Sequence, residues 1–187
     1  DDTTFHTFYF DADSGKPLFG KTAQGAGDNS CWARGQAWAM YGLPLGYRHT
    51  RNPYLLHRAA GVSAYFLEHL PEDGVCFWDL VFTSGDQKRD SSAAAIAACG
   101  LLEHASHLPL SHPRRRSYEN AAAGMVNALI DGYINRDRTD SSGLLTEAVY
   151  DMPKGVGVGE SCIWGDYFYL EALVRMVEDW RPYWQVD

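Results

Sequence analysis

The sequence lacks the features that mark several classes of protein. It contains no CxxC pair, which disfavours a zinc ribbon or a thioredoxin-like motif. No apolar run is long enough to cross a membrane. The net charge is −8 and clustered Lys and Arg are scarce, so we expect no nucleic-acid partner and no anionic-membrane partner. Low-complexity tracts are also absent, and we therefore expect a folded chain.

What the chain does have is apolar material. Of its 187 residues, 45% are hydrophobic and 13% are aromatic, which is enough for one globular domain with a core of its own. Three of the four cysteines lie among apolar or small residues, a setting typical of buried thiols. The chain begins at Asp1 and not at Met, so we expect it to be part of a longer translation product.

The amino-terminal segment alternates like a strand. Residues 7–10 and 18–19 flank the turn-rich stretch 11–17, a pattern that predicts a short hairpin. After about Ser30 the pattern predicts only helices, capped at the first by Asp28, Asn29 or Ser30 and at the third by Asp90. The second starts at Asn52-Pro53, with the proline at the first helical position. The five expected helices cover about 30–49, 52–70, 90 onward through the small-residue run 91–100, 113–133 and 164–180.

Buried faces are predicted for the last two helices. In the fourth helix we expect the following residues near one face: Tyr118, Ala122, Met125, Leu129 and Tyr133. In the fifth helix we expect the following residues to be buried: Phe168, Leu170, Leu173, Val174 and Val177.

The linkers alternate between short and long. Segments 50–52 and 108–112 are short, whereas 71–89 and 135–163 are long. Short links make antiparallel helical hairpins, and the long ones then gather at one end of the assembly. This alternation predicts an all-α toroid or helical-repeat array whose site lies at the long-loop end, beside the starts of the first, third and fifth helices.

The densest polar and aromatic segment covers residues 21–38. On a helix, Trp32 and Gln36 stand four residues apart, as do Arg34 and Trp38, which would place all four on adjoining strips of one surface. An indole ring covers the C–H face of a sugar, and an arginine offers a planar fork to a carboxylate. The pairing suits a uronic acid, although a partly buried capping and packing cluster remains the alternative.

Three motifs occur in order along the chain. They are Gln24-Gly25 with Asp28 and Ser30-Cys31-Trp32-Ala33-Arg34-Gly35-Gln36-Ala37-Trp38, then Asp90-Ser91-Ser92-Ala93-Ala94-Ala95, then Trp164-Gly165-Asp166-Tyr167-Phe168-Tyr169-Leu170-Glu171-Ala172-Leu173. Together with the early His6-Thr7-Phe8, this set closely resembles the signature of the unsaturated glucuronyl hydrolases, glycoside hydrolase family 88. Matches extend from His6 to about Arg175, nearly the whole chain.

The resemblance implies an (α/α)6 barrel of six helical hairpins, of which residues 1–187 would form the carboxyl-terminal half of a single catalytic domain. It also implies hydration of the C4=C5 double bond in a non-reducing-end unsaturated uronic acid of a lyase-derived oligosaccharide. A protonated carboxylic acid delivers a proton to the ring carbon, water adds, and the hemiketal opens to release the neighbouring sugar. No metal and no organic cofactor is expected.

Site residues follow from the same resemblance. The positions that match pocket-lining residues of the family are His6, Gln24, Trp32, Arg34 and Trp38. The two tryptophans would form aromatic walls, and Arg34 would hydrogen-bond the sugar or orient the acid. Trp78, Lys154 and Trp164 are candidates for the rim, with packing as the alternative for the tryptophans. Asp90 and Asp166 are interpreted as helix caps, not as catalysts.

The family's catalytic aspartate, and a second aspartate near it, lie upstream of the matching stretch. We therefore expect no catalytic residue in this chain, no turnover by the chain alone, and the missing amino-terminal half of the barrel as its partner. The resemblance further implies a bacterial cytoplasmic location.

Other readings remain open from the sequence. An unsaturated rhamnogalacturonyl hydrolase shares the barrel and the chemistry. A non-catalytic sugar-binding half-domain is favoured by the missing acid. A helical-repeat interaction module would leave the ordered motifs unexplained.

Overall fold

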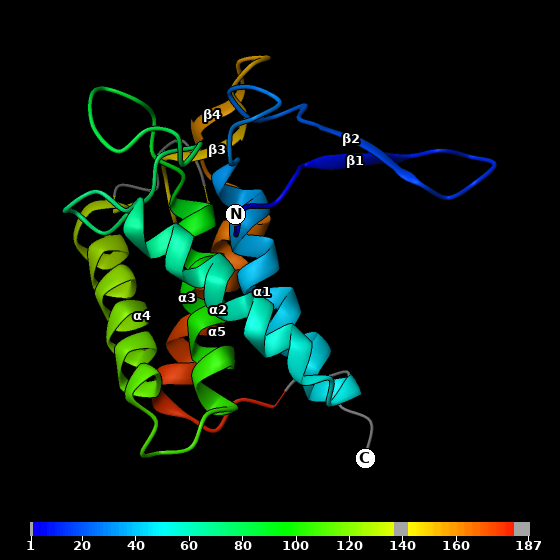
Figure 1. Ribbon diagram of the computed structural model, residues 1–187. Coiled ribbons are helices and arrows are strands. Elements are labelled where there is room, and N and C mark those ends of the chain that lie inside the picture. The colour runs from blue at the N-terminus through cyan, green and yellow to red at the C-terminus, as the bar shows by residue number, and fades with distance from the viewer. Residues whose placement is uncertain (1, 137–141, 182–187) are drawn as a thin grey trace.

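The computed structural model describes residues 2–136 and 142–181. The described part contains five helices, α1 (Ala33–Thr50), α2 (Pro53–Glu68), α3 (Ser91–Ser106), α4 (Pro113–Gly132) and α5 (Ile163–Val177). Two antiparallel hairpins accompany them, β1 (Thr7–Phe10) with β2 (Pro17–Lys21) and β3 (Ala148–Asp151) with β4 (Val156–Glu160) (Figure 1). The expected amino-terminal hairpin is confirmed, and β1–β2 projects from the helical body as an arm.

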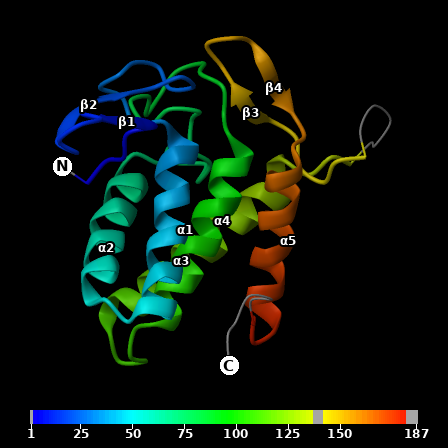
Figure 2. The same ribbon diagram turned by 90° about the vertical axis from the view of Figure 1, so that its right-hand side faces the viewer.

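The helices form two layers around α3. Helices α1, α3 and α5 pack side by side as one layer (Figure 2). Helices α2 and α4 form the second layer, with α2 packed against α1 and α4 packed against α3. The alanine-rich first turns of α3 allow this close packing, because small side chains let neighbouring helices approach. Gly100 marks the tightest approach: a Cβ there would lie 2.7 Å from the main-chain carbonyl carbon of Met40 in α1.

Helix starts follow the sequence signals in two cases out of three. The Asn52 side chain accepts a hydrogen bond from the Tyr54 N–H at 3.1 Å, ahead of Pro53 at the first helical position, and Asp90 caps α3. The predicted cap of the first helix is wrong: α1 begins at Ala33, after Trp32, without a side-chain cap. Ser30 instead donates its hydroxyl hydrogen bond to Asp79 at 2.6 Å.

The core confirms the predicted face of α4 and corrects that of α5. Tyr118, Ala122, Met125 and Leu129 are buried, and Tyr133 packs against the same core. In α5 only Phe168 and the other residues that face α3 are buried. Three residues predicted to be buried are exposed instead, namely Leu170 (50%), Val174 (41%) and Val177 (79%). The prediction failed because no element in the described chain covers that side of α5.

The long loop before α5 also departs from the all-helical expectation after Ser30, since it contains β3 and β4. Their turn needs left-handed backbone at Gly155 and Gly157, with φ of 64° and 59°. The predicted gathering of long loops at one end is confirmed. The Ala33 N–H at the start of α1 donates to the Trp78 carbonyl of loop 71–89, and the Ser91 N–H at the start of α3 donates to the Glu147 carbonyl of the loop before α5. The β3–β4 hairpin lies at the same end (Figure 2). No helix in residues 2–136 and 142–181 is long and apolar enough to span a bilayer.

Candidate functional site

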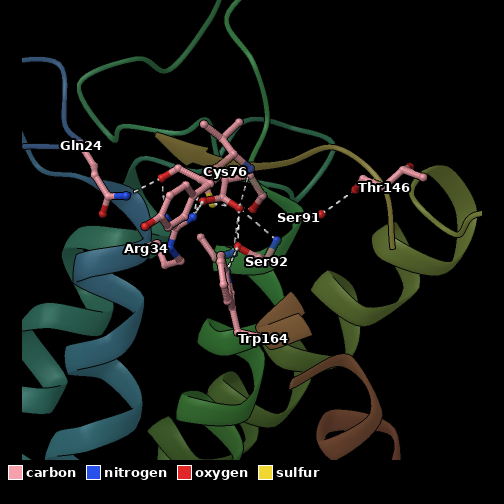
Figure 3. A network of polar contacts seen from close by, with 11 residues as sticks. Gln24, Arg34, Cys76, Ser91, Ser92, Thr146 and Trp164 are labelled. Atoms are coloured by element: carbon pink, nitrogen blue, oxygen red, sulfur yellow. Dashed lines mark hydrogen bonds and ion pairs between the residues drawn. The ribbon is translucent and has the colours of Figure 1, made fainter. Parts of the chain in front are cut away.

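Arg34 lies at the centre of a polar cluster where the inner helices begin. It occupies the first turn of α1 and is 2% exposed. Its Nη1 donates to Asp90 Oδ2 at 3.0 Å and to the Val149 carbonyl, and its Nη2 donates to the Tyr150 carbonyl at 2.7 Å (Figure 3). One guanidinium thus joins α1, the start of α3 and strand β3.

Asp90 divides its two carboxylate oxygens between the helix and the cluster. Oδ1 accepts from the Ser92 N–H at 3.1 Å, the Ala93 N–H at 3.3 Å and the Ser92 hydroxyl at 2.6 Å, so the predicted cap is confirmed. Oδ2 faces Arg34. Trp164, at the start of α5, donates its Nε1–H to the Ser92 hydroxyl at 3.2 Å, which brings the third inner helix into the same network (Figure 3).

Aromatic rings lie above and beside the guanidinium. His6 stacks on Trp32 with ring centroids 4.4 Å apart, and Arg34 Cζ lies 4.6 Å from the Trp32 ring and 5.4 Å from the Trp164 ring. Burial, then the nearby Arg34 charge, lowers the pKa of His6. Its Nδ1 accepts from the main-chain N–H groups of Ala23 and Gln24 at 3.2 and 3.3 Å, so the neutral ring carries its proton on Nε2.

The β3–β4 hairpin forms one wall of the cluster. Gln24 donates from Nε2 to the Tyr150 carbonyl at 2.7 Å, the same carbonyl that Arg34 contacts. At the turn, Lys154 Nζ lies 2.6 Å from Asp151 Oδ2, and this hydrogen bond lowers the pKa of Asp151 and raises that of Lys154. The Lys154 side chain remains largely exposed to solvent.

The structure thus brings together five of the predicted residues, and the hairpin carries a sixth. The five are His6, Gln24, Trp32, Arg34 and Trp164, and Lys154 lies on the hairpin. Trp38 lies one turn further along α1, is 37% exposed, and packs edge-on against Phe168 at 5.2 Å.

For Trp78 the structure favours the packing alternative, because it is 6% exposed and donates to Gln87 Oε1 at 3.2 Å inside the long loop. One prediction about this region fails. Gln36 does not share a surface with Arg34 and Trp38, because its Nε2 donates to the Val62 carbonyl of α2 at 3.0 Å. Gln36 and Trp38 lie two residues apart and therefore face nearly opposite sides of a helix with 3.6 residues per turn.

Tyr150 was missed by sequence reasoning. It is 47% exposed, its carbonyl joins Arg34 and Gln24, and its ring centroid lies 5.7 Å from that of Trp164. It lies outside the three motifs, and its only sequence signal is a position just before a glycine-rich turn. Asp166 was interpreted as a cap. It instead accepts from the Leu144 and Leu145 N–H groups at 2.9 and 3.0 Å and fastens the loop to α5.

The cluster offers hydrogen-bond donors and aromatic surface but no free acid. Its carboxylates, Asp90 and Asp151, are each paired with a cation, Arg34 and Lys154. The hydrogen bond from Lys154 lowers the pKa of Asp151, so that carboxyl stays ionised and does not serve as a general acid near neutral pH. Within residues 2–136 and 142–181, no group of three or more His, Cys, Asp and Glu side chains is arranged to hold a metal ion.

Two helical layers with long loops and a polar-aromatic cluster at one end define part of an α/α barrel with a site at its mouth. No protein-family model matches the chain. It is 50% identical to the unsaturated chondroitin disaccharide hydrolase of Streptococcus pyogenes serotype M1, an alignment that covers 98% of this chain and 46% of the relative.

Solved structures agree. The crystal structure of the unsaturated glucuronyl hydrolase of Bacillus sp. GL1 matches with a TM-score of 0.90 at 46% identity, over 94% of this chain and 47% of that one. A variant of the Streptococcus agalactiae enzyme, complexed with dGlcA-GalNAc6S, matches with a TM-score of 0.88 at 48% identity, over 98% and 49%. The chain is thus a homologue of the unsaturated glucuronyl hydrolases, shares their α/α-barrel fold, and spans about half their length.

Proposed function

We propose that residues 1–187 are the carboxyl-terminal half of an unsaturated glucuronyl hydrolase domain that hydrates a C4=C5 double bond. In this reaction a proton adds to C4 and the hydroxyl of water adds to C5, which gives a hemiketal. The hemiketal opens and releases the neighbouring sugar as the leaving group. The observation that carries the proposal is the cluster around Arg34 at the barrel mouth, built from motif residues in a chain homologous to these enzymes.

Each member of the cluster has a proposed part in sugar binding. His6 presents an Nε2–H donor, and Gln24 lies beside it on the Tyr150 carbonyl. Trp32 and Arg34 form the floor below them, and Trp38 offers an exposed indole face on the inner layer. A flat indole suits the C–H face of a sugar ring, and neutral donors suit its hydroxyls and carboxylate.

The acid is proposed to come from the half of the domain that this chain does not span. The exposed side of α5 supports that partner, because apolar residues recur on it at spacings of four and three. They are Ile163, Tyr167, Leu170, Val174 and Val177. This spacing is typical of a seam against another helix. The proposed occupant is the amino-terminal half of the barrel.

The names of the relatives indicate the substrate class. The S. pyogenes relative is named for an unsaturated chondroitin disaccharide, and the S. agalactiae variant is complexed with dGlcA-GalNAc6S. By homology we propose a glycosaminoglycan-derived unsaturated disaccharide for this chain, with Lys154 at the rim placed to meet an anionic group on the outer sugar. The same relatives favour the glucuronyl over the rhamnogalacturonyl alternative. A cytoplasmic location is proposed from family resemblance.

Binding by the chain itself tests the sugar site. Titration calorimetry with an unsaturated chondroitin disaccharide is expected to give measurable binding, and Trp38→Ala is expected to weaken it at least tenfold, about 1.4 kcal/mol. Trp78→Phe serves as the matched control, because Trp78 packs in the loop and is expected to leave the affinity unchanged. Equal affinity for the Trp38 variant and the wild type would reject this assignment of the pocket wall.

A further inference from the structure

The β3–β4 hairpin is held in place largely by side chains from other elements. Its own ladder is short, pairing Ala148 with Glu160, Val149 with Val158 and Asp151 with Val156. A two-stranded hairpin of this size is at best marginally stable alone. Additional hydrogen bonds come from α1, the β2–α1 segment and the start of α3, and they end on two consecutive residues, Val149 and Tyr150.

All of those hydrogen bonds except the one from Gln24 involve one buried ion pair, Arg34 with Asp90. Asp90 Oδ1 accepts from the Val149 N–H at 3.4 Å, while Arg34 donates to the Val149 and Tyr150 carbonyls and to Asp90 Oδ2. The side chains of Arg34 and Asp90 are 3% and 0% exposed. Removing either partner leaves a buried charge without compensation, so the two residues act as a unit.

We propose that Asp90 and Arg34 are positioning residues that lock the β3–β4 hairpin onto the starts of α1 and α3. The lock fixes where the hairpin presents Tyr150, Asp151 and Lys154 relative to His6 and Trp164. Asp90 acts through Arg34 and Val149 and needs no contact with a ligand. The lock itself does not depend on the proposed function. Only the statement that the β3–β4 hairpin borders a sugar pocket rests on that function.

Hydrogen exchange with and without the ion pair tests the lock. Asp90→Asn keeps a side-chain oxygen for the α3 cap and removes the charge that holds Arg34. We expect exchange of the hairpin amides at 148–151 and 156–160 to become at least tenfold faster, with α2 and α4 unchanged. Arg34→Gln is expected to have the same effect, and the double variant should exchange no faster than the faster single variant, because both remove one lock.

Asp166→Asn is the matched control. Asp166 is also an aspartate at the start of an inner helix and also accepts from main-chain N–H groups, those of Leu144 and Leu145. Its replacement is expected to loosen that loop and to leave the hairpin protected. If Asp90→Asn does not fold, Arg34→Lys replaces it. A lysine retains the charge opposite Asp90 but lacks the planar fork, so the hairpin should loosen while the first α3 amides stay protected.

The exchange experiment needs no sugar, so it separates the lock from the proposed function. If hairpin exchange is faster in the Asp90 and Arg34 variants but the chain binds no disaccharide, the result supports the proposed lock and rejects the proposed sugar site. Faster exchange together with at least tenfold weaker disaccharide binding supports both. Unchanged hairpin protection in the Asp90 and Arg34 variants, or acceleration spread equally over all helices, would overturn the proposal.

Discussion

His104 shows how burial changes the chemistry of a single residue. It lies in the last part of α3, is 3% exposed, and packs against Tyr118 with the rings tilted and their centroids 4.8 Å apart. Its Nδ1 has no hydrogen-bond partner in the described chain. Burial, followed by the charges of His107 and Arg114, lowers the pKa of His104 to about 4. Because the unfolded chain has the ordinary histidine pKa near 6.5, acid favours unfolding through this residue.

The resulting pH dependence has a defined window and sign. Between pH 6.5 and pH 4 the unfolded state binds a proton at His104 that the folded state excludes, so stability falls as the pH decreases. The loss approaches about 3 kcal/mol near pH 4. His104→Phe should flatten this part of the profile, measured by urea unfolding at several pH values. His57→Phe, at an exposed position of α2, should leave the profile unchanged. A wild-type slope that persists in the His104 variant would contradict this account.

At the residue scale, the sequence predicted which motif residues gather but not their partners. His6, Gln24, Trp32 and Arg34 lie within 29 positions of each other and were identified as a group. Arg34 was expected to reach a sugar or an acid. In the structure its Nη1 and Nη2 donate to Asp90 and to two carbonyls of β3, groups separated from it by 56, 115 and 116 positions. Such contacts depend on tertiary packing and leave no local pattern.

Among the elements, three inner helices are joined by one buried carboxylate. Glu103 of α3 is fully buried and accepts from Arg48 of α1 at 2.7 Å, from Arg175 of α5 at 2.9 Å, and lies 2.9 Å from His107 Nε2. Burial alone would raise the pKa of Glu103, but these hydrogen bonds and charges outweigh it and lower the pKa. The carboxylate therefore stays ionised and fastens α1, α3 and α5 at the end opposite the site.

Loss of that charge should be costly. Glu103→Gln leaves Arg48 and Arg175 without their shared partner, and we expect it to lower the free energy of unfolding by about 3–5 kcal/mol. Glu119→Gln is the control, because its pair with Arg115 on α4 is partly exposed to solvent and should contribute under about 1 kcal/mol. Chemical denaturation measures both variants. If both variants lose similarly small amounts of unfolding free energy, the buried network does not stabilise the inner layer.

Helix starts were predicted correctly where a local capping residue determines them. Elements were predicted wrongly where contacts with residues distant in the sequence determine them. Asn52-Pro53 and Asp90 are strong start signals, and both helices begin there. Ser30 gave an equally good signal, but Asp79 in the following long loop engages its hydroxyl, so α1 starts later. The β3–β4 hairpin was missed because its glycines weaken the strand pattern and its stability depends on Arg34 and Asp90.

At the scale of the whole molecule, the described chain ends its inner layer with an uncovered helix. Residues of α5 that the sequence predicted to be buried are exposed, and the chain spans about half the length of its relatives. Apolar stripes of this kind mark interfaces. The proposed amino-terminal half of the barrel would cover this stripe, because the apolar pattern of α5 itself fits a buried helix.

The uncovered stripe should make the isolated chain associate. In sedimentation velocity at tens of micromolar, we expect species larger than one chain, and Leu170→Glu should shift the distribution to the monomer. Leu110→Glu is the control, since Leu110 is 86% exposed in the α3–α4 link, at the end opposite the site. If the isolated chain is monomeric, or if both substitutions act alike, the stripe is not the association surface.

The most direct test of the central claim is turnover of an unsaturated chondroitin disaccharide, followed by loss of the ultraviolet absorbance of the conjugated double bond. The folded chain is assayed alone and after addition of the other half of the domain, taken from a full-length relative. The account predicts no turnover by the chain alone and turnover when both halves are present. Turnover by the chain alone would contradict the claim that the acid lies outside it. A folded, associated pair without turnover would contradict the assignment of the pocket walls to this half.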